Sequence, residues 1–573
     1  MKKRHLFVLA SLIPIFIACG GGDNSSNSSN NSSNSSDNSN NQNSSNNTTY
    51  QAPTAISNAK NSYTLTAWND LGMHCMDGTD FSVFSILPPY NNLHAQLKRK
   101  DGGLIDSGVT ITYEASVGMD GKINSSSANK TNFWQYVKKL FGVDLADDVG
   151  LKGNKMASKT PQKLKYNPTY QWWEAEGIPI TPYNDDMSKN YYSLVKVSAK
   201  DSSNNILSST LVVLPISDEL DCKRCHASGT TAKPQKGWVN MSDKNKDFKY
   251  NILRLHDERM PNAVKNNLQA LQKEGYNYKS EGLEATAKSG TPILCVACHK
   301  SNALPGIGID GIKAFTSAIH GFHNHVIDPK TDMRLGDSKN RSACYACHPG
   351  ATTKCLRGAM GDAKDSSGKN IIQCQNCHGN LANVGDSSRE GWIDEPNCQA
   401  CHHDGKREIS AITTDGTLRE VLDNRFATNP DTPMPGKSMY RFSKGHGTLQ
   451  CEACHGSTHA IYPAHKADNL FAEGIQGHSG TISECSACHS NVPQTATGGP
   501  HGMHTVGSSW IRTHQDVAEH NNNQCKACHG KDFRGSPLSK MWKDRKLAGR
   551  NFAKGHQVSC YDCHNGPNGG DDD

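Results

Sequence analysis

The segment Leu449-Gln-Cys451-Glu-Ala-Cys454-His455 contains the pattern that decides how this chain is built. Two cysteines are separated by two residues, and a histidine follows the second cysteine directly. The Cys-x-x-Cys-His pattern occurs nine times and accounts for 18 of the 21 cysteines among 573 residues. In chain order, motif 1 is Cys222, Cys225 and His226; motif 2 is Cys295, Cys298 and His299; motif 3 is Cys344, Cys347 and His348; motif 4 is Cys374, Cys377 and His378; motif 5 is Cys398, Cys401 and His402; motif 6 is Cys451, Cys454 and His455; motif 7 is Cys485, Cys488 and His489; motif 8 is Cys525, Cys528 and His529; and motif 9 is Cys560, Cys563 and His564.

This spacing is the attachment signal for heme c. Two thiols add to the two vinyl groups of one porphyrin, and the next residue places its imidazole beneath the iron. Zinc sites also use Cys-x-x-Cys, but zinc does not require a histidine directly after the second cysteine. Structural disulfides do not fit either, because Cys-x-x-Cys is a reactive redox geometry. We therefore expect nine covalently attached hemes c.

Nine irons closed on both faces need nine further ligands, and 16 histidines of the mature chain lie outside the motifs. Methionine is a possible axial ligand, but histidine is the more natural choice in so histidine-rich a chain. Four candidates precede a motif by four to seven residues, which indicates duplicated heme units. We expect such a histidine to bind a neighbouring heme, although each is alternatively an ordinary surface or hydrogen-bonding residue. The candidate second ligands are His256, His320, His323, His446, His459, His478, His504, His514, His520 and His556, with His325, His403, His465 and His501 in reserve.

The chain divides into regions of different composition. Residues 218–566 hold all nine motifs and are rich in Gly, Asn and Pro, and only 35% of the whole chain is hydrophobic. A core of side chains alone would pack poorly there, so we expect a heme-cored nonaheme cytochrome c domain of loops and short helices. Residues 567–573 are expected to form a short disordered tail.

Residues 60–217 have a different pattern, with β-branched alternating runs such as Val109-Thr-Ile-Thr-Tyr113. They predict a small β-sandwich-like domain without heme. One helix is expected at Phe133–Phe141, and Asp201-Ser-Ser-Asn-Asn205 is expected to close a hairpin.

Two cysteines outside the motifs, Cys75 and Cys355, belong to different predicted domains. In an oxidising compartment a disulfide between them is favoured over two buried thiols. His74, beside Cys75, is expected to be a residue of the β-rich domain, with ligation of a heme across the interface as the alternative.

The N-terminus predicts export. Met1-Lys2-Lys3-Arg4 precedes an apolar run, and residues 1–18 are expected to form a signal peptide. Ile17-Ala18-Cys19 resembles a bacterial lipobox, which would place a lipid on Cys19; a plain secretory signal is the alternative. Residues 19–50 then form a tether, because the Asn/Ser-rich tract cannot bury enough apolar surface to fold. We expect an exported protein that is lipid-anchored to the outer membrane or cell surface.

Two classes of function are excluded. After the N-terminus there are no 18 consecutive apolar residues, which excludes a multi-pass membrane protein. The net charge of +6 comes from basic residues that are spread evenly along the chain, so no nucleic-acid partner is expected.

With its nine motifs and lipobox-like start, the chain resembles the multiheme c-type cytochromes that electroactive, metal-reducing bacteria display outside the cell. The segments Cys454-His-Gly-Ser-Thr-His459-Ala-Ile-Tyr and Gly-Gly-Pro500-His-Gly-Met-His504 carry the likeness further. The resemblance implies low-spin heme arrays that pass electrons to minerals, to partner cytochromes or along filaments. Nine hemes differ from the decaheme proteins that dock on outer-membrane porins, so porin docking is not implied.

Three functions remain open at this point. The favoured one is an electron relay through closely packed bis-histidine hemes, with no catalytic residues. The second is a multiheme reductase of a small nitrogen or sulfur oxyanion, which needs one heme with an open face; no Cys-x-x-Cys-Lys motif is present to support it. The third is a structural or binding role, in which the β-rich domain binds a partner or self-assembles and the hemes conduct through the assembly.

Overall fold

The computed structural model describes residues 52–567, apart from 59, 302–305, 349–351, 388–439, 443, 445, 493–503, 505, 531, 536–538 and 542. The predicted signal peptide, Cys19 and the tether lie outside the described residues, as do motif 5 and residues 568–573 of the tail. The reserve histidines His403 and His501 lie outside them as well.

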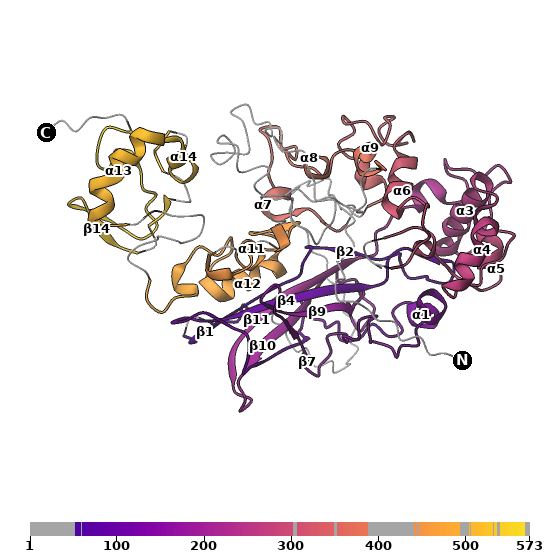
Figure 1. Ribbon diagram of the computed structural model, residues 1–573, viewed down its shortest axis with the longest axis horizontal. Coiled ribbons are helices and arrows are strands. Elements are labelled where there is room, and N and C mark those ends of the chain that lie inside the picture. The colour runs from indigo at the N-terminus through magenta and orange to yellow at the C-terminus, as the bar shows by residue number, and fades with distance from the viewer. Residues whose placement is uncertain are drawn as a thin grey trace, which may run out of the picture.

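Two five-stranded sheets dominate the N-terminal region (Figure 1). The first has the order β1 (Tyr63–Trp68), β4 (Tyr90–Arg99), β9 (Trp172–Pro179) and β8 (Lys165–Asn167), with β5 (Leu104–Ile105) paired to β4. The second has the order β2 (His74–Cys75), β11 (Ile206–Ser217), β10 (Tyr192–Lys200), β6 (Thr110–Ala115) and β7 (Gln162–Lys163). Within these two sheets, pairing is antiparallel except between β2 and β11.

Strand β4 shows why these residues form a buried sheet. Leu93, Ala95 and Leu97 are fully buried and alternate along the strand, so they line one face. The residues between them, His94 and Gln96, point to the opposite face and are buried as well. That second face is covered by the segment around motif 6, because Gln450 N donates to Gln96 Oε1 at 3.0 Å. A sheet covered on both sides carries polar side chains only where they have partners or a function.

Local signals in the sequence account for two further features. The helix expected at Phe133–Phe141 is α1, with the same bounds, and Gly142 ends it in the left-handed conformation at φ 69°. The expected hairpin joins β10 to β11. In its turn, Asp201 Oδ1 accepts hydrogen bonds from the backbone N–H groups of Ser203 and Asn205.

Beyond residue 217 the described chain consists mainly of helices, many of them a single turn long. The first group comprises α2 (Lys223–His226), α3 (Lys244–Arg259), α4 (Ala263–Lys273), α5 (Leu283–Lys288), η1 (Cys295–Ala297), α6 (Phe315–His323), η2 (Ala343–Ala346), α7 (Gly358–Gly361), α8 (Cys374–His378) and α9 (Leu381–Val384). The second comprises η3 (Tyr440–Phe442), η4 (His446–Thr448), α11 (Cys451–His455), α12 (Lys466–Gln476), η5 (Cys485–Ala487), α13 (Ser508–Asn521), α14 (Asn523–His529) and η8 (Cys560–Asp562). Short strands occur at β3 (Phe84–Ser85), β12 (Ile293–Leu294), β13 (Ala460–Ile461), β14 (Arg545–Leu547) and β15 (Arg550–Phe552).

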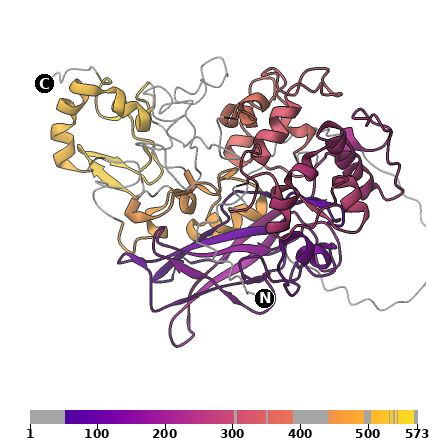
Figure 2. The ribbon, with the colours of Figure 1, turned by 45° about the vertical axis from the view of Figure 1, so that its right-hand side comes forward.

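The two regions are not separated at residue 217. Strand β3 of the N-terminal region pairs with β12, which directly precedes motif 2. One hydrophobic cluster contains Val197 and Leu214 of the second sheet together with Phe248 of α3 and Leu294 of β12. The expected domain boundary is therefore a change in composition within a shared core, and Figure 2 shows the helices packed along the sheets.

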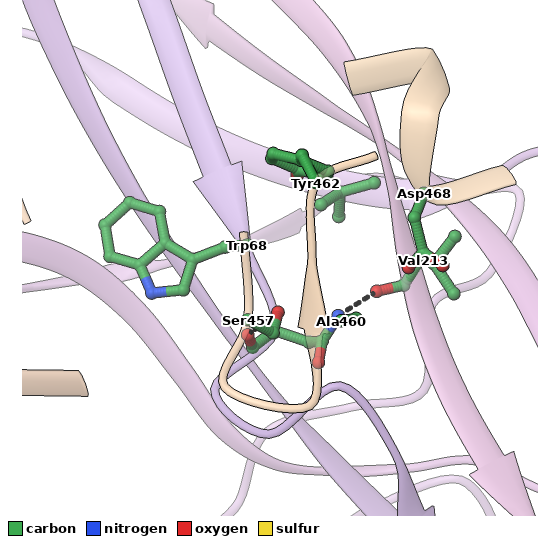
Figure 3. A pocket seen from close by; sticks show the side chains of 8 residues that line it. Trp68, Val213, Ser457, Ala460, Tyr462 and Asp468 are labelled. Atoms are coloured by element: carbon green, nitrogen blue, oxygen red, sulfur yellow. Dashed lines mark hydrogen bonds between the residues drawn. The ribbon is translucent and has the colours of Figure 1, made fainter. Parts of the chain in front are cut away.

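The segment after motif 6 packs on strands β1 and β11. Ser457 Oγ donates to the carbonyl oxygen of Asn69, and Asn69 Nδ2 donates to Val213 O at 3.1 Å. Figure 3 shows the small cavity that remains at this contact, lined by Trp68, Asn69, Val212, Val213, Ser457, Ala460, Tyr462 and Asp468. The β-rich region thus forms the floor on which this part of the motif region lies.

Cys75 and Cys355 are both buried in the same hydrophobic cluster. Ser217 pairs with Cys75 between β11 and β2, and Ser217 Oγ lies 3.1 Å from Thr353 Oγ1, two residues before Cys355. The chain therefore brings the two segments together, and the disulfide stays a prediction.

Among the described residues, no helix combines the length and the apolar composition that a membrane span requires.

A buried ion pair within the motif region gives a test of this packing, because its Arg357 also donates to the carbonyl oxygen of Gly72 in the β-rich region. Arg357 Nε and Nη2 each lie 2.8 Å from an oxygen of Asp468, and both side chains are buried. Asp468→Asn leaves the guanidinium without a counter-charge, so we expect a loss of about 3–5 kcal/mol in the free energy of unfolding, measured by chemical denaturation.

The control is Asp144→Asn, which removes the exposed ion pair with Lys138. Solvent screens that pair, so the control is expected to change stability little. Equal effects of the two substitutions would show that Arg357 does not anchor the motif region.

Candidate heme-binding site

Each described motif is folded as a short helical turn. The backbone N–H of the motif histidine donates to the carbonyl of the first cysteine, for example from His226 to Cys222 at 3.0 Å and from His348 to Cys344 at 2.9 Å. The same bond occurs in motifs 2, 7 and 9. Residues three and four apart lie on one side of such a turn, so both thiols and the imidazole project toward the same space.

The cysteines of the motifs differ in exposure. Most of the described ones, among them Cys225 of motif 1 and Cys377 of motif 4, are half-buried. Cys374 is fully buried, whereas Cys563 of motif 9 is exposed.

Motif 5 is the one predicted heme site about which the structure gives no information. Cys398, Cys401 and His402 lie outside the described residues. Heme attachment at this motif stays a prediction from the sequence, as it does at the eight described motifs.

Six motif histidines face a histidine from outside the motifs. Their ring centroids lie 5.8–6.2 Å apart. The pairs, motif residue first, are His226 with His323, His348 with His320, His378 with His459, His489 with His446, His529 with His504 and His564 with His514.

A seventh pair is indicated by electrostatics. Burial lowers the pKa of His256; nearby Asp257 raises it, and His299 of motif 2 lowers it further. His256 on α3 therefore lies close enough to His299 to interact with it electrostatically, and its role as a second ligand stays a prediction.

The separation within the pairs is the one that a shared metal requires. Imidazole nitrogens bind metals at about 2.0–2.1 Å, so two rings on opposite sides of one ion have centroids about 6 Å apart. Rings that stack directly lie closer, as His504 and Trp510 do at 4.1 Å. The described histidine pairs fit an iron between them.

The orientation of the rings fits as well. His323 Nδ1 donates to Ile319 O at 2.7 Å, and His514 Nδ1 donates to Ile511 O at 2.8 Å. Nδ1 of His299, His529 and His564 likewise lies 2.8–2.9 Å from a backbone carbonyl oxygen. A proton fixed on Nδ1 leaves the lone pair of Nε2 for a metal, which is the usual outer-shell arrangement of a metal-binding histidine.

Burial also favours the neutral form of the histidines, which is the form that binds a metal. It lowers the pKa of His226 and of His459 to about 4 each, which keeps the imidazoles neutral, as metal ligands must be. Burial also raises the pKa of the Cys454 thiol to about 12 and that of Cys298 to about 11. These thiols therefore lack the lowered pKa of redox-active cysteines.

The structure does not bring three candidate second ligands to a described motif histidine. His556 Nε2 lies 2.8 Å from Asp562 Oδ2, and His478 Nε2 lies 3.6 Å from Glu484 Oε1. His520 is exposed near the end of α13. His446, which also stands shortly before a motif, does face a described motif histidine.

Two other histidines have roles within the protein scaffold. His465 stacks on Tyr192 at 4.0 Å between centroids, and its Nδ1 accepts from Ala467 N at the start of α12. His74 Nε2 lies 3.1 Å from Asp70 Oδ1 in a buried contact. The expectation that His74 is a residue of the β-rich region agrees with this contact.

A further cluster was missed by the sequence reasoning. His94, Glu174 and Glu176 come together on the first sheet, where His94 lies directly opposite Glu174 in the register of β4 and β9. The available signal was a set of ionisable residues inside two largely buried strand segments, which carries no spacing rule of the Cys-x-x-Cys-His kind.

Comparisons with known proteins give no match to a family, to a curated protein or to a solved structure.

Helix α13 offers a matched test of the histidine pairs. His514 faces His564 at 5.9 Å, whereas His520 on the same helix is exposed and faces no described motif histidine. If the pair encloses an iron, His514→Ala opens one face of it. We expect one low-spin ferric signal to be replaced by a high-spin signal in low-temperature EPR of the oxidised protein.

His520→Ala is expected to leave the spectrum unchanged. A high-spin signal in both variants, or in neither, would contradict the assignment of His514 as an axial ligand.

Proposed function

We propose that the protein is a nine-heme c-type cytochrome that relays electrons across or outside the cell envelope to an extracellular or periplasmic acceptor. The observation that carries the proposal is the set of six described motif histidines that each face a second histidine at 5.8–6.2 Å. Heme c supplies reversible one-electron oxidation and reduction when it is bound. The residues of the chain hold each paired site closed and arrange the sites in a row.

The row, meaning the order in which the motifs lie next to one another in space, starts at α3. This helix interacts with two motifs. Asn251 Nδ2 donates to the carbonyl of His226 in motif 1, at 3.0 Å. Further along the same helix, His256 lies near His299 of motif 2. Lys249 interacts electrostatically with both Cys222 and Cys295. One helix therefore fixes motifs 1 and 2 beside each other.

Motifs 1, 3 and 4 follow in contact. The backbone N–H of Asp221, the residue before motif 1, donates to the carbonyl of Cys347 in motif 3 at 2.9 Å. Cys344 of motif 3 forms a side-chain hydrogen bond with Cys374 of motif 4. Tyr345 Oη supports the same contact by donating to Gln373 Oε1 at 2.7 Å.

The row continues through motif 6 to motif 7. His459, four residues after the histidine of motif 6, faces His378 of motif 4. On the other side, the backbone N–H of Ile482 donates to the carbonyl of Cys454 at 2.8 Å, just before motif 7. His446, just before motif 6, faces His489 of motif 7.

Motifs 8 and 9 form the far end. His529 Nδ1 of motif 8 lies 2.9 Å from the carbonyl oxygen of Val558, just before motif 9. Lys554 Nζ lies 2.7 Å from Glu484, which precedes motif 7. In Figure 1 the elements run accordingly from α3 through α8 and α11 to α13 and α14 along the sheets.

The contacts thus give the spatial order 2, 1, 3, 4, 6, 7, followed by the pair of motifs 8 and 9. Within this order, six sites have a second histidine facing the motif histidine, and this favours a relay over the reductase, which needs one open face. With a lipid on Cys19 as anchor, the two ends of the row are the places for exchange with other cytochromes, with a mineral or metal acceptor, or with a second copy of the chain. The exposed Cys563 of motif 9 fits an end of the row that meets such a partner.

A direct test separates the relay from the reductase. The purified oxidised protein is studied by low-temperature EPR with heme quantified in parallel, before and after addition of nitrite or hydroxylamine. We expect nine low-spin hemes per chain, no change on adding either compound, and no turnover with a reduced electron donor. A high-spin heme that shifts with nitrite or hydroxylamine would instead identify an enzyme.

A further inference from the structure

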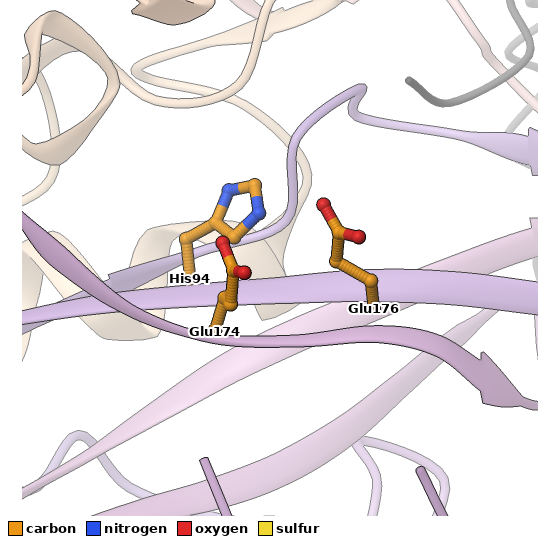
Figure 4. Close-up of side chains that lie close together, drawn as sticks. All are labelled: His94, Glu174 and Glu176. Atoms are coloured by element: carbon orange, nitrogen blue, oxygen red, sulfur yellow. The ribbon is translucent and has the colours of Figure 1, made fainter. Parts of the chain in front are cut away.

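The cluster of His94, Glu174 and Glu176 lies on neighbouring strands of the first sheet, on the face that the segment around motif 6 covers. One donor atom from each residue lies within 4.8 Å of the other two. Figure 4 shows the imidazole of His94 on β4 and the two carboxylates on β9 gathered on the same side of the sheet.

His94 is held in place without its ring nitrogens being used. Its ring stacks on Trp172 at 4.2 Å between centroids and meets Trp68 edge to face at 5.9 Å. The residue is 4% exposed, and neither Nδ1 nor Nε2 has a hydrogen-bond partner among the described residues. A buried imidazole with both nitrogens unused is unfavourable unless something binds it.

Glu174 is oriented by its neighbours. Trp172 Nε1 donates to Glu174 Oε2 at 2.6 Å, and Asn167 Nδ2 lies 3.1 Å from both carboxylate oxygens. Carboxylates that bind metals are commonly fixed by such hydrogen bonds from a second layer of residues.

Glu176 is the carboxylate of the cluster that has a cationic partner. The ammonium group of Lys152 contacts its Oε2. The side chain of Lys152 is 20% exposed, so it has a route into solvent. The neighbouring Asp70 is already occupied, since it accepts hydrogen bonds from His74 and Asn92.

We propose that His94, Glu174 and Glu176 form a binding site for one divalent transition-metal ion, which enters as Lys152 turns out toward solvent. One imidazole and two carboxylates suit Zn²⁺, Mn²⁺ or Fe²⁺, and no thiolate is present among the three to select a softer ion. Three protein ligands leave at least one position for water. The site uses none of the motif cysteines or histidines.

Zinc is the probe for the test. The heme-loaded protein is treated with a chelator, dialysed and titrated with Zn²⁺, and bound zinc is measured by mass spectrometry with iron in the same sample as the count of chains. We expect one zinc per chain with nitrogen and oxygen ligands in X-ray absorption. His94→Gln and Glu176→Gln are expected to weaken binding at least about tenfold.

Two further variants sharpen the test. Glu114→Gln, which removes a carboxylate paired with Lys196 elsewhere in the β-rich region, is the control and should bind as the wild type does. Lys152→Gln removes the competing ammonium group and should bind zinc more tightly, so it tests the site even if a buried variant fails to fold. Zinc binding that is absent from the wild type, or that is unaffected by His94→Gln and unaffected by Lys152→Gln, would overturn the proposal.

Discussion

Two imidazole rings that share one metal ion must be held with their centroids about 6 Å apart, and this distance is the constraint on which the motif region depends. The members of a pair come from different places in the chain. His378 on α8 faces His459, and a stretch of 80 residues separates them. His226 and His323 are even more distant in sequence. Each of these pairs therefore closes a long loop, and an ion that binds both rings stabilises that closure.

The sheets make such pairing possible in a chain with few apolar residues. Residues of both sheets pack into one hydrophobic cluster with α3, which carries His256, and with β12, which directly precedes motif 2. The segment around motif 6 packs on the polar face of β4, where Gln450 N donates to Gln96 Oε1. Arg357 connects the two regions, because it pairs with Asp468 of α12 and donates to the carbonyl oxygen of Gly72 in the β-rich region. Side-chain packing against the sheets thus positions the parts of the motif region that contact them. The histidine pairs connect the remaining motifs to these parts.

Features that depend on neighbouring residues in the sequence, such as helices and turns, could be predicted from the sequence. Contacts between distant segments were harder to predict. Phe133–Phe141 forms a helix because its buried residues share one face and Gly142 ends it. His256, His320 and His323 were selected because the chain offers few alternatives between the first three motifs. By contrast, His478, His520 and His556 stand before a motif as His446 does, but whether a ring faces another motif depends on the path of the chain. The register that sets His94 opposite Glu174 is likewise a property of the whole sheet, and it leaves no local sign in the sequence.

The most direct test of the paired-histidine account is an experimental structure of the exported, heme-loaded protein by electron cryomicroscopy. The account predicts an iron between the two rings of each described pair, with the motifs in the order 2, 1, 3, 4, 6, 7 and then 8 with 9. Irons that are bound by the motif histidines alone, with His320, His323, His446, His459, His504 and His514 turned away, would contradict it.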